Sequence, residues 1–335
     1  MPAFRSCLLV LLCFCTTGLR SQQIDWSARL SSFFDNTEFE GSMYQSPQTM
    51  AGIRFAPELE LSKNTEHTIH AGVDLLKKFG SKALLDDYAP IVYYKYTGNA
   101  FRFYLGSFPR IGLLDAYSRA FFQDSIAYYR PNLNGMLWAY KQDDLQATVF
   151  LDWTGYQTEL DHEKFFVGGL LRYDFSTFFV EAHGLMHHYA GSKTLSGVRD
   201  MLLAQANLGL SLSDHVFLDA LVVRLGYLGG FERNRSMDLG WQIRPGWMAD
   251  VVLEWKQFGL HSTQYLGKGL MVDYAQMGNQ LYWGDPFFRG RSYNRTDLSY
   301  RFFKKQDAQL KLNLSQHFSG GRCYVEQSLL LNVAF

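Results

Sequence analysis

The chain has 335 residues and is electrically balanced, with 32 Lys and Arg against 32 Asp and Glu. This balance excludes the strong basic excess that is typical of nucleic-acid-binding proteins. The mean hydropathy is -0.15, and after the N-terminal segment no apolar run is long enough for a membrane-spanning helix. Aromatic residues nevertheless make up 16% of the chain, and the 29 glycines far outnumber the 8 prolines. This combination is typical of many strands joined by tight turns, with aromatic girdles at the membrane interfaces.

Residues 1–21 are predicted to be a secretory signal peptide. Arg5 supplies a positive start, and an apolar core follows. Because this core is shorter than the roughly 20 residues of a spanning helix, we expect it to be removed rather than to anchor the chain. Lipidation at Cys13 or Cys15 is the alternative, although both follow bulky residues, which lipoprotein signals disfavour. Cleavage would leave Cys323 as the sole cysteine, so no intramolecular disulfide is expected.

Alternating apolar and polar residues predict β-strands from the start of the mature chain. In residues 26–35 and 51–62, nearly every second residue is apolar and those between are mostly polar or charged. A period of two places the two kinds of side chain on opposite faces of a strand. Residues 67–77 repeat the pattern after a compact turn at 63–66, which predicts a hairpin.

The connections between the later predicted strands alternate between short and long. The short turns lie at residues 97–99, 142–144, 174–176, 212–214, 256–257 and 304–306. The long connections lie at residues 36–48, 79–87, 109–131, 155–163, 190–199, 228–246 and 268–293. Outer-membrane barrels have short periplasmic turns and longer extracellular loops, whereas a soluble β-sandwich has no reason to sort its loops. We therefore predict one all-β domain over residues 22–335, a transmembrane antiparallel β-barrel of about 16 strands.

The last predicted strand stops at the C-terminal Phe335. Its apolar residues, among them Leu329, Leu331 and Val333, share one face, and polar residues occupy the other. A final strand with a terminal aromatic residue resembles the assembly signal of bacterial outer-membrane β-barrel proteins. The whole pattern, with the aromatic segment at 283–286, resembles porin-like barrels of the Bacteroides group. The resemblance implies the bacterial cell outer membrane as location but transfers no functional residue.

The polar face of the strands is expected to line a water-filled lumen. Charges of both signs occur on it, and unpaired charges are costly in a low-dielectric wall, so we expect ion pairs between facing side chains. The candidate pore-lining residues are Arg54, Glu58, Glu60, Arg102, Arg172 and Lys311. The alternative is that such pairs only brace the barrel.

Two long connections are candidates for the site of specificity, because loops on a rigid scaffold usually carry it. The connection at 109–131 is the candidate constriction loop, in which Arg110, Arg119 and Asp124 lie among aromatic residues. The connection at 268–293 also mixes aromatic and charged residues. These either bind sugars or a protein, or pack on one another as a stable cap.

Catalytic and metal-binding motifs are not found: there is no G-x-S-x-G elbow, Walker loop, H-E-x-x-H or paired C-x-x-C. His183 and His187 would lie about 13 Å apart on one strand face, too far for one metal ion. With His188 they form the richest His group of the chain, and the two that share a face are expected to be polar groups facing the pore. The residues at 161–162 and 261–262 offer the ingredients of an outer-membrane hydrolase, but their spacing does not require one. We predict a non-enzymatic protein without cofactor or metal.

The predicted function is a porin-like channel for passive diffusion of small hydrophilic solutes. The expected partners are outer-membrane lipid and lipopolysaccharide, small polar solutes, and either further copies of the chain or an outer-membrane complex. No nucleic-acid partner is expected. The alternative is a plugged barrel that acts as an accessory or docking subunit of an outer-membrane complex.

Overall fold

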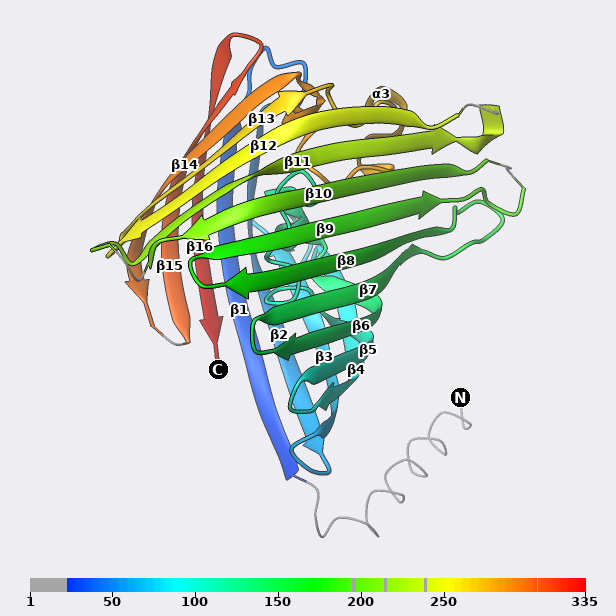
Figure 1. Cartoon of the computed structure of the whole chain (residues 1–335). Helices are drawn as coiled ribbons and strands as arrows, with labels where there is room; N and C mark the ends of the chain where they lie inside the picture. The colour runs from blue at the N-terminus through cyan, green and yellow to red at the C-terminus, as the bar shows by residue number, and fades with distance from the viewer. Residues whose placement is uncertain (1–22, 195–196, 214–215, 238–239, 306) are drawn as a thin grey trace.

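The computed structural model describes residues 23–194, 197–213, 216–237, 240–305 and 307–335. These residues form 16 antiparallel strands in one closed barrel (Figure 1), which confirms the predicted fold class. The first eight strands are β1 (Gln23–Glu38), β2 (Gln48–Ser62), β3 (His67–Lys78), β4 (Asp87–Thr97), β5 (Phe101–Pro109), β6 (Asn132–Gln142), β7 (Leu145–Gly155) and β8 (Lys164–Phe175). The remaining strands are β9 (Phe178–Tyr189), β10 (Arg199–Ser211), β11 (Ala220–Asn234), β12 (Gln242–Trp255), β13 (Phe258–Gly267), β14 (Ser292–Lys304), β15 (Ala308–Ser319) and β16 (Arg322–Ala334). The predicted signal peptide lies outside the described residues.

The alternation along each strand sets which face meets lipid. On β2, Phe55 and Leu59 are 42% and 59% exposed, whereas Arg54 and Glu58, which directly precede them, are 5% and 4% exposed. Because successive side chains point to opposite faces, the apolar set covers the outer wall and the charged set lies in the lumen.

The connections are sorted between the two ends of the barrel as predicted. β1 begins and β16 ends at the end that carries the short turns (Figure 1). The predicted bounds are wrong at both ends of β11. This strand begins at Ala220, well after the turn placed at 212–214, and the connection placed at 228–246 spans only 235–241, because β11 and β12 keep pairing through Gly229 and Gly230. A Cβ on Gly230 would lie 3.1 Å from the Leu270 side chain, so glycine leaves room for the loop that enters the lumen there.

Two of the long connections turn into the barrel instead of leaving it (Figure 1). We call residues 110–131 the first plug loop and residues 268–291 the second plug loop. The first contains helix α2 (Asp124–Tyr129), and the second contains α3 (Tyr274–Met277) and the 3₁₀ turns η4 (Gly278–Gln280) and η5 (Pro286–Arg289). A further 3₁₀ turn, η3 (Arg235–Met237), follows β11. None of the described helices is long and apolar enough to cross a membrane.

The plug loops bind each other and fill part of the lumen with aromatic side chains. The amide of Gln123 donates to the carbonyl of Trp283, and the amide of Asp285 donates to the carbonyl of Arg119, both over 2.8 Å. Between them, Gly284 lies so close that a Cβ would come within 1.9 Å of the Ala120 carbonyl oxygen. The fully buried side chains of this region include Phe121, Tyr282, Phe287 and Phe288. The interpretation of residues 268–293 as a packed cap is therefore the one that this structure supports.

The division of faces predicts opposite outcomes for neighbouring substitutions on β7. Val149→Arg puts a charge on the lipid face and should destabilise the barrel by about 2–4 kcal/mol if the residue lies near the bilayer midplane. Thr148→Arg puts the same charge in the lumen and should cost much less. Urea unfolding of both variants in lipid vesicles measures the difference; equal destabilisation would contradict the assigned faces.

Candidate functional site

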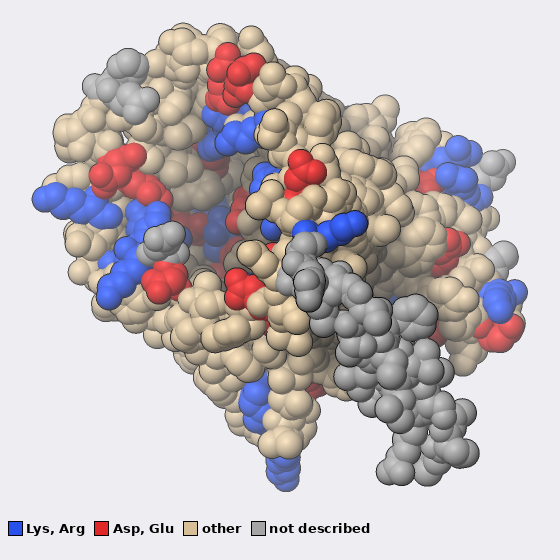
Figure 2. Space-filling view, turned by 90° about the horizontal axis from the view of Figure 1, so that it is seen from below, with Lys and Arg blue, Asp and Glu red and all other residues tan. Residues whose placement is uncertain are grey.

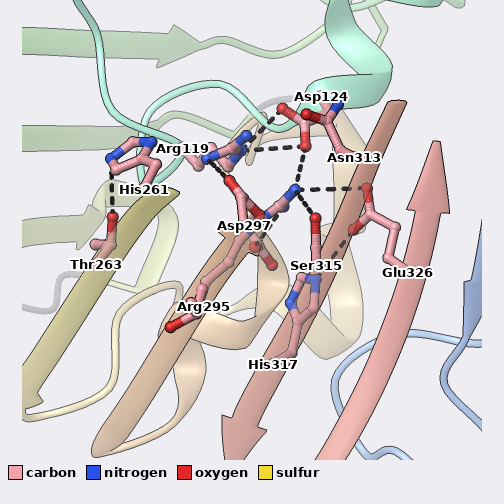
Figure 3. Close-up of polar contacts among 12 residues, drawn as sticks. Arg119, Asp124, His261, Thr263, Arg295, Asp297, Asn313, Ser315, His317 and Glu326 are labelled. Atoms are coloured by element: carbon pink, nitrogen blue, oxygen red, sulfur yellow. Dashed lines mark hydrogen bonds and ion pairs between the residues drawn. The ribbon is translucent and has the colours of Figure 1, made fainter. Parts of the chain in front are cut away.

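An ion-pair cluster joins the first plug loop to the barrel wall (Figure 3). The Arg119 guanidinium lies 2.9 Å from a carboxylate oxygen of Asp124 and 2.9 Å from one of Asp297. Arg295 lies 2.8 Å from both of these carboxylates and 3.5 Å from Glu326. Two arginines and three carboxylates thus share one network, in which each buried charge has an oppositely charged partner.

The period of two along the strands directs the wall residues of this ion-pair cluster into the lumen. Arg295 and Asp297 lie on one face of β14, and Glu326 faces the lumen from β16. Burial by itself raises the pKa of Asp124, but the guanidinium groups of Arg119 and Arg295 outweigh it and lower the pKa to about 2. The Asp124 carboxylate is therefore charged, and the charge holds the loop against the wall.

All three predicted constriction residues lie in the lumen. Besides Arg119 and Asp124, Arg110 is buried and its guanidinium lies 2.6 Å from Asp152 on β7. The same guanidinium stacks over the Trp283 ring at 5.4 Å, so it also joins the two plug loops. The contacts of these three residues fix the plug loops to the wall. Their role as a filter for solutes stays a prediction.

Three of the six predicted pore-lining residues form ion pairs with charged neighbours along the lumen wall. Arg54 pairs with Asp74, Glu58 with Arg29 at 2.6 Å, and Arg172 with Asp174 at 2.5 Å and Glu181 at 3.5 Å.

The other three predicted pore-lining residues are placed differently. Glu60 is partly exposed, 3.8 Å from His70, and Arg102 is exposed near the short-turn end. Lys311 lies opposite Arg301 on β14 and β15. That these six residues line a conducting path stays a prediction.

Two cavities lie beside the first plug loop. One of about 590 Å³ is bordered by Arg54, Asp124 and Tyr128 and extends to Lys304 in the β14–β15 hairpin at the short-turn end. A second of about 390 Å³ is bordered by Arg224 and other residues of β9–β14. Figure 2 shows the hollow from the short-turn end, with acidic and basic side chains around it. Charged and apolar side chains together therefore line the cavities, whereas aromatic rings fill the half towards the long loops.

A second polar site lies on the outside of the wall. His188 and Asp200 are directly opposite one another on β9 and β10, and His188 Nδ1 lies 2.9 Å from an Asp200 carboxylate oxygen. Arg235 Nε binds the other carboxylate oxygen over 2.6 Å. The Asp200 side chain is only 3% exposed beneath these two partners. Because the Asp200 contact uses Nδ1, His188 Nε2 is left for another partner.

This site continues a row of residues across five strands. Strand pairing aligns Trp153, Phe165, His188, Asp200 and Arg233 from β7 to β11. The Phe165 ring lies 4.9 Å from the His188 ring and 5.0 Å from the Trp153 ring. The row therefore passes from lipid-facing aromatic rings through a His–Asp pair to arginines at the long-loop end.

The height of His188 places it near the outer boundary of the membrane. It follows the exposed Phe178, at the short-turn end of β9, by ten residues. At about 3.3 Å per residue and a tilt of about 45°, ten residues rise roughly 23 Å, close to the ~25 Å apolar band of such barrels. Ester bonds of membrane lipids lie at this boundary between head groups and acyl chains.

The three histidines of β9 lie on two different faces of the wall. His183 and His187 do face the lumen, where they are buried, but the period of two puts His188 on the opposite face. That alternation was visible in the sequence. Its pairing with Asp200 was not, since no sequence pattern records which residues of two strands stand opposite each other. Of the other hydrolase ingredients, His261 pairs with Asp250 in the lumen and Ser262 faces outward.

Fold and site together define an outer-membrane β-barrel protein with a plugged lumen and a polar site on its outer wall. A family model described as lipid A 3'-O-deacylase-type matches residues 17–333, so the chain belongs to this outer-membrane family. No curated protein matches the chain. This match contradicts the prediction of a non-enzymatic protein, because the family bears the name of an enzyme.

Solved outer-membrane porins resemble the chain in fold. A loop L8 deletion mutant of OmpT from Vibrio cholerae has a TM-score of 0.57 at 10% identity, over 94% of this chain and 100% of that chain. An anion-selective porin from Comamonas acidovorans has a TM-score of 0.56 at 10% identity, over 94% and 100%. OmpF of Salmonella typhi, in a complex with daunomycin, has a TM-score of 0.54 at 10% identity, over 94% and 98%. At this identity the likeness shows the barrel fold alone, which agrees with the predicted location in the outer membrane.

The lowered pKa of Asp124 predicts acid release of the first plug loop. A carboxylate with a depressed pKa stabilises the docked state above its ordinary value of 3.8, and this stabilisation is lost as pH falls through about 2. Cleavage by pepsin, which is active in acid, should therefore become about tenfold faster in this loop across that window. Asp124→Asn should be cleaved readily at both ends of the window.

Asp115→Asn is the matched control, because Asp115 lies in the same loop, accepts a hydrogen bond from the Gly112 amide and forms no ion pair among the described residues. The Asp115→Asn variant should keep the wild-type pH dependence of pepsin cleavage in this loop. Identical cleavage profiles for wild type and Asp124→Asn would show that this carboxylate does not hold the loop.

Proposed function

We propose that the protein is an outer-membrane hydrolase that removes an ester-linked acyl chain from lipid A at the His188–Asp200 site. Two independent observations support this. The family model covers nearly the whole chain, and the site lies on the lipid-facing wall near the height of lipid ester bonds. The observation that carries the proposal is the His188–Asp200 contact on the outer wall.

The chemistry of the proposed site follows from the contact. A carboxylate that accepts the Nδ1 proton fixes the imidazole tautomer whose Nε2 can accept a proton. His188 Nε2 takes a proton from water, the resulting hydroxide attacks the ester carbonyl, and the proton then passes to the departing alkoxide. The products are a free fatty acid and a lipid hydroxyl group, so one water is consumed and no further reactant is needed.

The arginines near the site match the chemistry of the lipid head group. Arg235 is 53% exposed beside Asp200, and Arg233 stands opposite Asp200 on β11. Guanidinium groups bind phosphates in a planar, two-bond geometry, so they are suited to hold a phosphorylated sugar head. The aromatic row from Trp153 to Phe165 offers an apolar surface to the acyl chain.

Substitution of the histidine tests the proposal. His188→Gln should lower the rate of fatty-acid release from lipid A by about 10²- to 10⁴-fold, the usual contribution of a general base. Mass spectrometry of lipid A incubated with the purified barrel measures the loss of one acyl chain. His183→Gln, on the same strand but facing the lumen, should retain the wild-type rate. Equal rates for wild type and His188→Gln would refute the assignment.

Passive diffusion of small hydrophilic solutes is a second candidate function. It is favoured by the charged cavities that border the first plug loop, and it requires the aromatic packing of the plug loops to open. Arg119→Ala removes contacts to Asp124 and Asp297 and should increase the frequency of discrete conductance steps in planar bilayers. Arg102→Ala, at the exposed end of the lumen, should not. A folded barrel that stays silent in all three forms would count against a channel.

A further inference from the structure

The larger of the two cavities has walls that are partly apolar. Its volume is about 590 Å³, and apolar side chains of the first plug loop, β1 and β16 border it. They are Phe33, Ile111, Leu114, Ile126, Ala127 and Leu330. Ile111 is 61% exposed, although its loop lies inside the barrel. Apolar surface that stays uncovered in a concave site is typical of a place that binds an apolar group.

One wall of this cavity is already formed, because helix α2 is held against β1 and β2. The rings of Phe33 and Tyr128 stack with their centroids 4.5 Å apart and their planes at 2°. Arg54 Nε donates to the Tyr128 carbonyl over 2.6 Å. Ile126 and Ala127 belong to the same helix, so their positions at the border are fixed too. A preformed site loses less conformational entropy on binding than one that must first close.

The mouth of the cavity at the short-turn end is basic. Lys304 and Lys305 of the β14–β15 hairpin border it, and both are exposed. Neither lysine forms an ion pair within the described part of the chain. Arg29 of β1 also borders the cavity, and its side chain is 34% exposed beside Glu58, which is 2% exposed. The same hairpin contributes one carboxylate to the border, Asp307, so positive charge is in excess at this end.

The charged groups deeper in the cavity already have partners. Arg54 pairs with Asp74, and Arg110 lies 2.6 Å from a carboxylate oxygen of β7. The Asp124 carboxylate is held in the ion-pair cluster described above. Asp115 lies between the two cavities, since it borders both. Unpaired positive charge is therefore found at the mouth, and the apolar walls lie farther in.

We propose that the larger cavity binds a single-chain amphiphile with a carboxylate head group, that is, a fatty acid. The head group lies at Lys304 and Lys305, where its negative charge complements the basic mouth. The acyl chain extends along Ile111 and Leu114 and removes their apolar surface from water. The volume of about 590 Å³ lies within the ~300–1,000 Å³ that is typical of small-ligand sites.

The ligand enters from the aqueous side of the barrel. Short turns of outer-membrane barrels face the periplasm, and the hollow opens at this end (Figure 2). The cavity is separate from the proposed hydrolase site, because it lies in the lumen, whereas His188 lies on the outer face of β9. Fatty acids are also products of the proposed hydrolysis, so binding is tested with added fatty acid and without lipid A.

Calorimetric titration of decanoate into the full mature barrel in lipid nanodiscs tests the proposal, with empty nanodiscs as the reference. Decanoate should bind saturably at one site. Octanoate should bind about tenfold more weakly, because two fewer methylene groups are buried. Lys304→Gln combined with Lys305→Gln should weaken the binding of decanoate about fivefold and leave that of decanol, which carries no charge, unchanged. Lys63→Gln combined with Lys256→Gln, in two other short turns, should bind both ligands as the wild type does.

Substitution of Ile111 tests the apolar end of the site. Ile111→Asp places a carboxylate along the path of the acyl chain and should weaken the binding of decanoate by about tenfold or more. Leu84→Asp is the matched control, because Leu84 is 91% exposed in the connection between β3 and β4, and it should keep the wild-type affinity. Heat-dependent mobility on gels confirms that each variant is folded.

The outcome is distinguishable from that of the hydrolase experiment. His188→Gln should bind decanoate with wild-type affinity even where it no longer releases fatty acid. Heats equal to those of empty nanodiscs, equal affinities for decanoate and decanol, or wild-type affinity in folded Ile111→Asp would each overturn the fatty-acid site.

Discussion

The structure depends on one constraint, which is that hydrocarbon offers no partner to a backbone amide or carbonyl. A sheet in lipid must therefore have no free edge. β1 and β16 meet this requirement by pairing from Arg29 opposite Ala334 to Glu38 opposite Val325. Once the sheet is closed, the period of two assigns every side chain to lipid or lumen. The apolar wall and the charged interior both follow from closure.

Closure with 16 strands creates a second problem, because side chains of the wall cannot fill so wide a lumen. The two plug loops supply the missing volume. Trp283, Phe287 and Phe288 fill the long-loop half with buried aromatic rings, and Arg119 and Arg295 bind the plug to the wall. The interior is thus divided into a packed half and a charged half, which an unplugged porin fold alone would not require.

The face on which a residue lies also decides which molecules can reach it. Lumen groups such as Arg54 and Arg224 border the cavities, whereas His188 faces the membrane and Asp200 lies buried beneath it. A lipid ester can meet only the second set. The assignment of a histidine to one face or the other therefore separates a channel residue from a candidate catalytic residue, although the two are neighbours in the chain.

The sequence by itself determined the barrel, because the period of two and the sorting of loops are local properties of the chain. It also placed Arg110, Arg119 and Asp124 in a loop that enters the lumen, since charges among aromatic residues mark such a segment. Only the tertiary structure decided their partners and the pairing of His188 with Asp200. Contacts between strands depend on register, and register results from closure of the whole sheet, so no short stretch of sequence contains it.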